Sequence, residues 1–360
     1  MKERTSVNAA HENIGGDMVS ANLSIESPIR IKKIYFKNRV VKAPAVCFGW
    51  KCIDGIMSEQ HLEHYEQYAK AEVGMIILQS ILVNRDHQNP DCYAGIYQDG
   101  QIGYLSELAA RLHKHKAVVF AQLQYADLTK YRPGKDRYSS MEQLEITRIG
   151  ADFTEAIIRC KKAGLDGVEI HGAHTYILNV LASSAANRRS DCYGGNLEGR
   201  LRLVTDIMKL SAGVNNDDFL ISYRMGWDVD EQTDILTAQY LESIGIDLLH
   251  ASVGIPINRV IKKPEGYEFN SSVYFAGILK QHVNCPVIAV NDIRNYKRGS
   301  WLIRNGQADF AAYGKPLLAD PEMILISREN PEYEPCIKCP RCQWFFDGTN
   351  CPVRKKRERL

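Results

Sequence analysis

Short hydrophobic runs alternate with amphipathic segments eight times along the chain. The runs are almost continuously apolar, as in GMIILQSILV at 74–83 and AVVFAQLQYA at 117–126. Continuous apolar runs are typical of parallel strands that are covered on both faces. The predicted strands span 38–46, 74–83, 117–126, 166–173, 219–226, 247–254, 286–293 and 308–317.

Helical periodicity fills the intervals between these runs. In 58–72, Leu62, Tyr65 and Tyr68 recur at helical spacing after Ser58, a residue that suits an N-cap. Further helices are predicted at 101–116, 147–164, 197–213, 233–245, 271–283, 295–305 and 320–328. Eight such βα units predict an α/β fold, the (β/α)8 TIM barrel. A doubly wound sheet is the competing fold, but no G-x-G-x-x-G follows the first strand.

Composition narrows the class of protein. Hydrophobic residues make up 45% of the 360 residues, charged residues 24%, and the formal net charge is +2. This composition excludes a disordered chain or a coiled coil, and the near-neutral charge argues against nucleic acid and anionic membranes as partners. The chain has no apolar run near the ~20 residues of a membrane helix and no signal-peptide segment in its first 25 residues, so we expect a cytoplasmic protein.

The predicted units divide the chain into three parts. We expect a flexible N-terminal extension over 1–27, the barrel over 28–330, and a cysteine-rich segment with a basic tail over 331–360. The connection over 127–146 is long for a compact barrel, which is typical of a lid or a substrate wall.

Polar residues gather where the predicted strands end, which is where barrel enzymes have their active sites. The most distinctive segment is HGAHTY, with His171 at the end of the fourth strand, His174 three residues later, and Tyr176. Two imidazoles can hold a carbonyl oxygen on which negative charge develops, and a phenol can act as a general acid. A metal site is the less favoured alternative, because no third ligand lies nearby in the sequence.

The segment DGVEIHGAHTYILNVLASSAANRRSDCYGGNLEGRLRL at 166–203 resembles the signature of the old yellow enzyme family, FMN-dependent ene-reductases on a (β/α)8 barrel. The resemblance extends in order from about residue 28 to 352, including FKNRVVKAPAV at 36–46 and ADFAAYGKPLLADPEM at 308–323. It implies FMN as cofactor, NAD(P)H as electron donor, and a small enone or enoate as substrate.

The resemblance also assigns roles to individual residues. His171 and His174 would bind the substrate carbonyl, and Tyr176 would donate the proton after hydride transfer from flavin N5. The remaining residues would contact FMN: Pro44, Ala45, Val46 and Ser80 along the ring, Gln122 and Arg224 at the pyrimidine edge, and Asn291, Asp292, Gly314 and Lys315 at the phosphate.

This chain departs from the family pattern at several of these positions. The family commonly has Thr or Cys at Val46 and His at Tyr125. It also has a glycine pair, or Gly-Arg, where this chain has Asn291–Asp292, and Gly-Arg where it has Gly314–Lys315. Lysine keeps the positive charge but lacks the bidentate guanidinium.

Cys336, Cys339, Cys342 and Cys351 have the spacing C-x2-C-x2-C-x8-C. Such thiolates can hold zinc or a [4Fe-4S] cluster, and spacing alone does not separate the two. Because the segment follows the eighth barrel unit, where relatives of 2,4-dienoyl-CoA reductase and trimethylamine dehydrogenase carry their cluster, the resemblance favours [4Fe-4S], with zinc or a vacant remnant as alternatives.

Two functions follow from these patterns. The first is an FMN-dependent reductase of the C=C bond of an α,β-unsaturated carbonyl compound. The second is an FMN and iron–sulfur electron-transfer subunit that works with a partner protein. The complete HGAHTY set favours the enzyme, because a relay needs neither a carbonyl clamp nor a proton donor. An external electron-transfer partner and a homo-oligomer both remain open.

Overall fold

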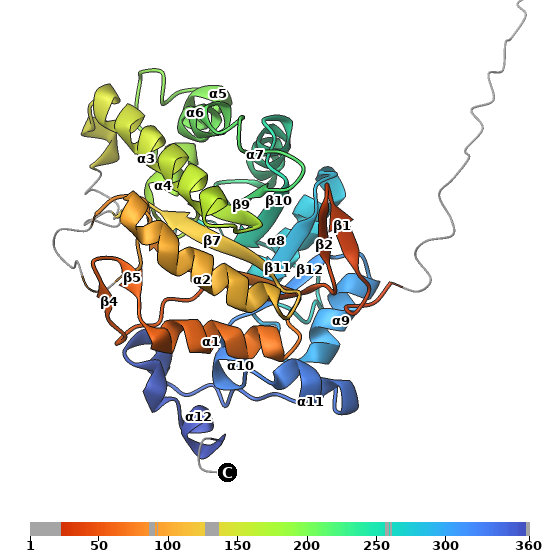
Figure 1. The fold of residues 1–360 in the computed structure, drawn as a ribbon. Coiled ribbons are helices and arrows are strands. Elements are labelled where there is room, and N and C mark those ends of the chain that lie inside the picture. Colours follow the sequence, from red (N-terminus) through yellow and green to blue (C-terminus); the bar gives the residue numbers. More distant parts are fainter. Residues whose placement is uncertain are drawn as a thin grey trace, which may run out of the picture.

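The computed structural model describes residues 23–85, 91, 93–126, 137–255, 259 and 261–357. Eight parallel strands close into a barrel in the order β10-β11-β12-β3-β6-β7-β8-β9 (Figure 1). They are β3 (Val40–Lys42), β6 (Met75–Leu82), β7 (Val118–Gln124), β8 (Gly167–Gly172), β9 (Leu220–Gly226), β10 (Leu248–Ser252), β11 (Val287–Val290) and β12 (Phe310–Tyr313). Each lies within a predicted run, so the predicted (β/α)8 barrel is confirmed.

Helices surround the barrel strands (Figure 1). The predicted ones are α1 (Glu59–Lys70), α2 (Ile102–His113), α3 (Gln143–Lys162), α7 (Glu231–Ser243), α8 (Ser271–His282), α9 (Tyr296–Arg304) and α11 (Met323–Glu329). The segment predicted as one helix over 197–213 is two, α5 (Leu197–Arg200) and α6 (Arg202–Leu210), because Leu201 leaves the helical conformation. Three short helices were not predicted: α4 (Ile177–Ala182), α10 (Lys315–Ala319) and α12 (Pro352–Arg357).

Helix α1 illustrates how the local sequence sets an element. Ser58 is its N-cap, as predicted, and the backbone N–H of Ser58 donates to Nδ1 of His61 at 3.3 Å. Leu62, Tyr65 and Tyr68 are buried on the face that packs on the barrel. The helix is therefore held by a capped start and an apolar face.

The barrel interior is apolar in the half that lies toward the amino-terminal ends of the strands. Side chains from seven of the strands form one buried cluster there, and many of them are the first residues of their strands, including Met75, Val118 and Leu220. A hairpin of β1 (Ile29–Ile31) and β2 (Ile34–Phe36) packs its isoleucines against this cluster. The hairpin therefore closes the amino-terminal end of the barrel, which leaves the carboxyl ends of the strands for a site.

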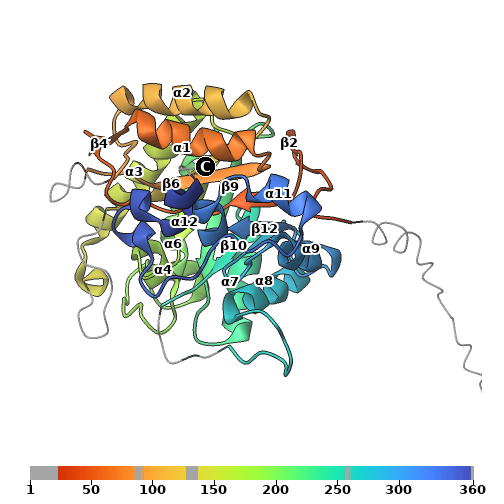
Figure 2. The ribbon, with the colours of Figure 1, turned by 90° about the horizontal axis from the view of Figure 1, so that it is seen from below.

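The C-terminal segment packs on the outside of the barrel beside α1 (Figure 2). It consists of the 3-10 turns η4 (Gln343–Phe345) and η5 (Gly348–Asn350) and of α12. Trp344 and Cys351 from this segment form a buried cluster with Cys47, Trp50 and Leu318 of the barrel. Smaller elements elsewhere are β4 (Cys52–Ile53), β5 (Ile56–Met57), η2 (Asp99–Gln101) and η3 (Tyr138–Ser140).

Some predicted features lie outside the described residues. These are most of the N-terminal extension, positions 127–136 of the long third loop, and the last three residues of the basic tail. Among the described helices, none has the length and apolarity that crossing a membrane requires.

Candidate active site

An irregularity in β6 turns Ser80 into the barrel. The register between β6 and β7 shifts between Ile77 and Ser80, and the N–H of Gln79 leaves the ladder to donate to the Tyr65 hydroxyl at 2.8 Å. The Ser80 hydroxyl then lies 3.0 Å from Oε1 of Gln122 and 2.7 Å from Oε1 of Gln124. A bulge of this kind re-aims a side chain toward a site. Ser80 and Gln122, both predicted site residues, are thereby brought together.

A buried carboxylate links Gln122 to His250. Glu169 accepts from Nε2 of Gln122 at 2.7 Å and from Nδ1 of His250 at 2.6 Å. Burial would raise the pKa of Glu169, but His250, Arg224 and Gln122 together hold it below its usual value. Burial lowers the pKa of His250, so the imidazole is neutral and donates to an ionised carboxylate.

The predicted carbonyl clamp forms one cluster at the end of β8. Nε2 of His171 lies 3.3 Å from Nδ1 of His174, and the Tyr176 ring is centred 5.1 Å from the His171 ring. His171 is also the register partner of Arg224 on β9. The histidine pair, the tyrosine and the buried arginine therefore share one corner of the barrel.

The four predicted phosphate residues line a single cavity of about 640 Å³ at the ends of β11 and β12. Asn291 and Asp292 have φ values of +75° and +51°, the left-handed region that Asn and Asp tolerate better than other non-glycine residues. They can therefore replace the family's glycine in this turn. The Asp292 carboxylate pairs with Arg294 at 2.8 Å and with Arg298 at 3.2 Å, which offsets its repulsion of an anion.

Pro44, Ala45 and Val46 follow β3 and are half-buried. The N–H of the next residue, Cys47, donates to Oε1 of Gln79 at 3.0 Å, so this loop is held against β6. Ala45 also packs against the buried cluster of the C-terminal segment. Their predicted contact with the flavin ring stays a prediction.

The four clustered cysteines line one small cavity of about 30 Å³ beside Trp344. Cys351 is buried, the other three are partly exposed, and all four are free thiols. Among the residues that the structure describes, no three His, Cys, Asp or Glu side chains form a group that could hold a metal ion. The arrangement of these thiols therefore does not support the predicted [4Fe-4S] cluster or zinc, and both stay predictions.

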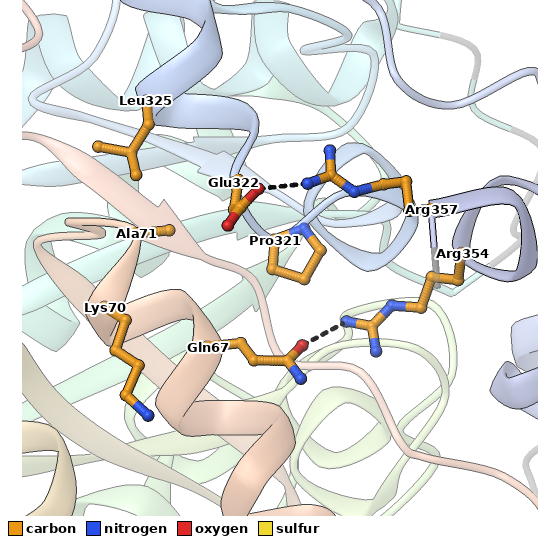
Figure 3. Close-up of a pocket in the computed structure, with 8 residues that line it drawn as sticks. All are labelled: Gln67, Lys70, Ala71, Pro321, Glu322, Leu325, Arg354 and Arg357. Carbon is orange, nitrogen blue, oxygen red and sulfur yellow. Dashed lines mark hydrogen bonds and ion pairs between the residues drawn. The ribbon is translucent and has the colours of Figure 1, made fainter. Parts of the chain in front are cut away.

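A separate cavity of about 350 Å³ lies between α1, α11 and α12 (Figure 3). Arg354 reaches across it to Gln67 at 3.4 Å, and Arg357 pairs with Glu322. None of the predicted site residues lines this cavity. The Arg354–Gln67 hydrogen bond and the Arg357–Glu322 ion pair attach α12 to the barrel. We therefore interpret this cavity as a packing feature.

Sequence reasoning missed two residues that the fold brings to the site: Glu169 and Arg294. A signal existed for Glu169, since it interrupts an apolar strand with a polar side chain. Arg294 carries no such signal, because arginine is ordinary in loops.

Comparisons with known proteins agree with this fold. Residues 24–330 match the family model of the "NADH:flavin oxidoreductase / NADH oxidase family". The NADH oxidase of Thermoanaerobacter brockii is 32% identical over 339 residues, which cover 86% of this chain and 52% of that protein, so the chain spans about half of its length. The NADPH dehydrogenase of Halalkalibacterium halodurans is 30% identical over 309 residues, which cover 81% and 90% of the two chains.

Solved structures show the same fold. Morphinone reductase superposes with a TM-score of 0.73 at 20% identity, covering 93% of this chain and 97% of its own. The old yellow enzyme homologue from Zymomonas mobilis gives 0.72 at 23% identity, with coverages of 91% and 99%. The chain therefore belongs to the NADH:flavin oxidoreductase / NADH oxidase family, the old yellow enzyme family of FMN-dependent oxidoreductases.

Proposed function

We propose that this protein uses NAD(P)H and FMN to reduce the C=C bond of a small α,β-unsaturated carbonyl compound. The observation that carries the proposal is the cluster of His171, His174 and Tyr176 at the end of β8, beside Arg224. A carbonyl clamp next to a phenol is what conjugate reduction needs, because charge develops on the carbonyl oxygen and the α-carbon needs a proton.

The residues present suit FMN. Within the described part of the chain, Nε of Arg224 and Nε2 of Gln79 are buried without a hydrogen-bond partner, a costly state that a polar ligand edge would relieve. Arg224 and Gln122 would hold the pyrimidine edge, and the Asn291–Asp292 and Gly314–Lys315 turns would hold the phosphate. When bound, FMN supplies the hydride.

The chain's own residues then act on the substrate. His171 and His174 orient the carbonyl and stabilise negative charge on its oxygen. Tyr176, whose ring neighbours His171, delivers a proton to the α-carbon from its hydroxyl. Ser80 and Glu169 act indirectly, because their hydrogen bonds hold the two ends of the Gln122 amide in place.

The electron-transfer alternative has less support. It requires a second redox centre, and the cysteine segment forms no metal-binding group among the described residues. The histidine and tyrosine cluster would also have no task in a relay. The predicted iron–sulfur cluster, the protein partner and the oligomer stay predictions.

An anaerobic stopped-flow experiment tests the proposal. The FMN-loaded protein is reduced with NADPH or NADH and then mixed with 2-cyclohexen-1-one as the probe. We expect flavin reoxidation at a rate that depends on enone concentration, with cyclohexanone as the product. Flavin that reoxidises only with dioxygen or a quinone, with no saturated product from any enone or enoate tested, would overturn the proposal.

A further inference from the structure

Ser252, the last residue of β10, contacts the second histidine of the clamp. Its hydroxyl oxygen lies 2.8 Å from Nε2 of His174. Ser252 is fully buried, and its strand is separated from His174 by 78 residues of sequence. The contact is therefore a product of barrel closure.

The direction of this hydrogen bond follows from the serine. Among the described residues, Nε2 of His174 is the one acceptor within reach of the Ser252 hydroxyl. If the hydroxyl instead accepted a proton from His174, its own hydrogen would be buried without an acceptor, which costs about 1–3 kcal/mol. Ser252 therefore donates, and Nε2 of His174 carries a lone pair.

The tautomer of His174 follows in turn. In a neutral imidazole with an accepting Nε2, the proton resides on Nδ1. That nitrogen faces Nε2 of His171 at 3.3 Å, which is the position where the proposed clamp would hold a carbonyl oxygen. An incoming carbonyl oxygen would accept a hydrogen bond from this Nδ1–H group.

The backbone holds His174 beside Ser252. His174 and Thr175 have φ values of +60° and +70°, which is strained for a β-branched residue such as threonine. The N–H of His174 donates to the carbonyl of Val253 at 3.3 Å, and the N–H of Thr175 donates to the Asn179 side chain at 3.0 Å. These two bonds hold the strained loop against the end of β10, directly beside Ser252.

We propose that Ser252 is a positioning residue that holds His174 as the Nδ1–H tautomer, so that His174 presents a defined donor to the substrate carbonyl. This inference rests on the proposed function for its catalytic consequence. The tautomer itself is a property of the substrate-free protein and can be measured without any reaction.

The first measurement is the tautomer. The FMN-loaded protein is labelled with ¹⁵N-histidine, and the His174 resonances are assigned by their loss in His174→Asn. We expect the Nδ1–H tautomer in the wild type and in Ser252→Thr, and a shift toward Nε2–H in Ser252→Ala. The matched control is Ser222→Ala, since Ser222 is a fully buried barrel serine whose hydroxyl has no partner in the described part of the chain.

The second measurement is the reaction of the reduced protein with 2-cyclohexen-1-one. We expect Ser252→Ala to slow this step about 10- to 100-fold, as loss of one preorganised donor to a developing oxyanion does. Ser252→Thr should restore most of the rate, and flavin reduction by NAD(P)H should be unchanged in all three serine variants.

The outcomes separate the two proposals. A wild-type His174 protonated on Nε2 overturns the role of Ser252 whatever the activity, as does a Ser252→Ala variant with unchanged tautomer and rate. If no enone is reduced although the tautomer depends on Ser252, the proposed function fails while the structural inference stands.

Discussion

The carboxylate of Glu169 accepts a hydrogen bond from the side-chain amide of Gln122 at 2.7 Å in the fully buried interior of the barrel. The same carboxylate accepts from His250, and its charge faces Arg224. A single acidic side chain thus joins three strands beneath the proposed flavin site. Two of its neighbours, Gln122 and Arg224, are proposed cofactor ligands.

Glu169→Gln should therefore be strongly destabilising. The NH2 group of the new amide would face one of the two existing hydrogen-bond donors, Gln122 or His250. The substitution also removes the negative charge that compensates Arg224. Breaking a buried pair in this way costs about 3–5 kcal/mol in the free energy of unfolding. Urea unfolding of the FMN-loaded protein measures it, with Glu63→Gln as the control because Glu63 is exposed on α1. Equal midpoints for the two variants would contradict the prediction.

Tyr176→Phe should slow the oxidative half-reaction with 2-cyclohexen-1-one and leave flavin reduction by NAD(P)H nearly unchanged. The phenol acts only when the α-carbon takes up its proton, and general acids contribute about 100- to 10,000-fold. Stopped-flow absorbance resolves the two half-reactions. Tyr35→Phe, at a residue 52% exposed on β2, is the control. Equal slowing of both half-reactions would instead make Tyr176 a structural or flavin-contacting residue.

Arg224→Ala should weaken FMN binding about 10- to 100-fold, the equivalent of one charged hydrogen bond. It should also lower the midpoint potential of whatever flavin stays bound, because a cation beside the reduced ring is lost. Arg224→Lys keeps the charge and should recover part of both effects. Arg304→Ala, on the exposed face of α9, should change neither. Full occupancy with an unchanged potential would remove Arg224 from the cofactor site.

Cys339→Ala should leave FMN content and the unfolding midpoint of the barrel nearly unchanged. Cys339 is partly exposed in a segment that packs outside the barrel. Iron, inorganic sulfide and zinc should be assayed in wild type and variant prepared without oxygen, with the exposed Cys192→Ala as the control. Iron and sulfide that are lost only in Cys339→Ala would establish the predicted cluster and contradict the geometry seen here. A large loss of FMN would show that the segment supports the flavin site.

Acid should destabilise the protein through the histidines beneath the C-terminal segment. Burial lowers the pKa of His61 to about 4, and burial also holds the pKa of His64 well below its usual value of 6.5. As the pH falls from 6.5 toward 4, the unfolded chain binds protons that the folded chain refuses, so the free energy of unfolding falls. For His61 the loss is at most about 3 kcal/mol.

Urea midpoints at pH 7 and pH 5 test this pH dependence. His61→Asn should show a smaller difference between the two pH values than the wild type. His113 provides the opposite sign, because its hydrogen bond to Asp166 raises its pKa, and His113→Asn should not reduce the acid sensitivity. Undiminished acid sensitivity in His61→Asn would exclude His61 as a source.

Much of this molecule is determined by patterns that are local in sequence. Continuous apolar runs separated by amphipathic segments specify eight parallel strands and their covering helices, because burial on both faces leaves no polar alternation. The HGAHTY segment also keeps its two histidines and its tyrosine together through its local sequence. They lie within six residues of one another, so a single turn brings them into contact.

Tertiary structure decided the contacts that cross the barrel. Glu169 reaches His250 over 81 residues and Ser252 reaches His174 over 78, and no periodicity in the sequence encodes either pair. The bulge that turns Ser80 inward depends on the Tyr65 hydroxyl of α1, which takes the N–H of Gln79 out of the ladder. The hydrophobic pattern of each strand is determined by the strand's own residues. These contacts instead depend on strand register and barrel closure, which exist only once all eight strands have paired.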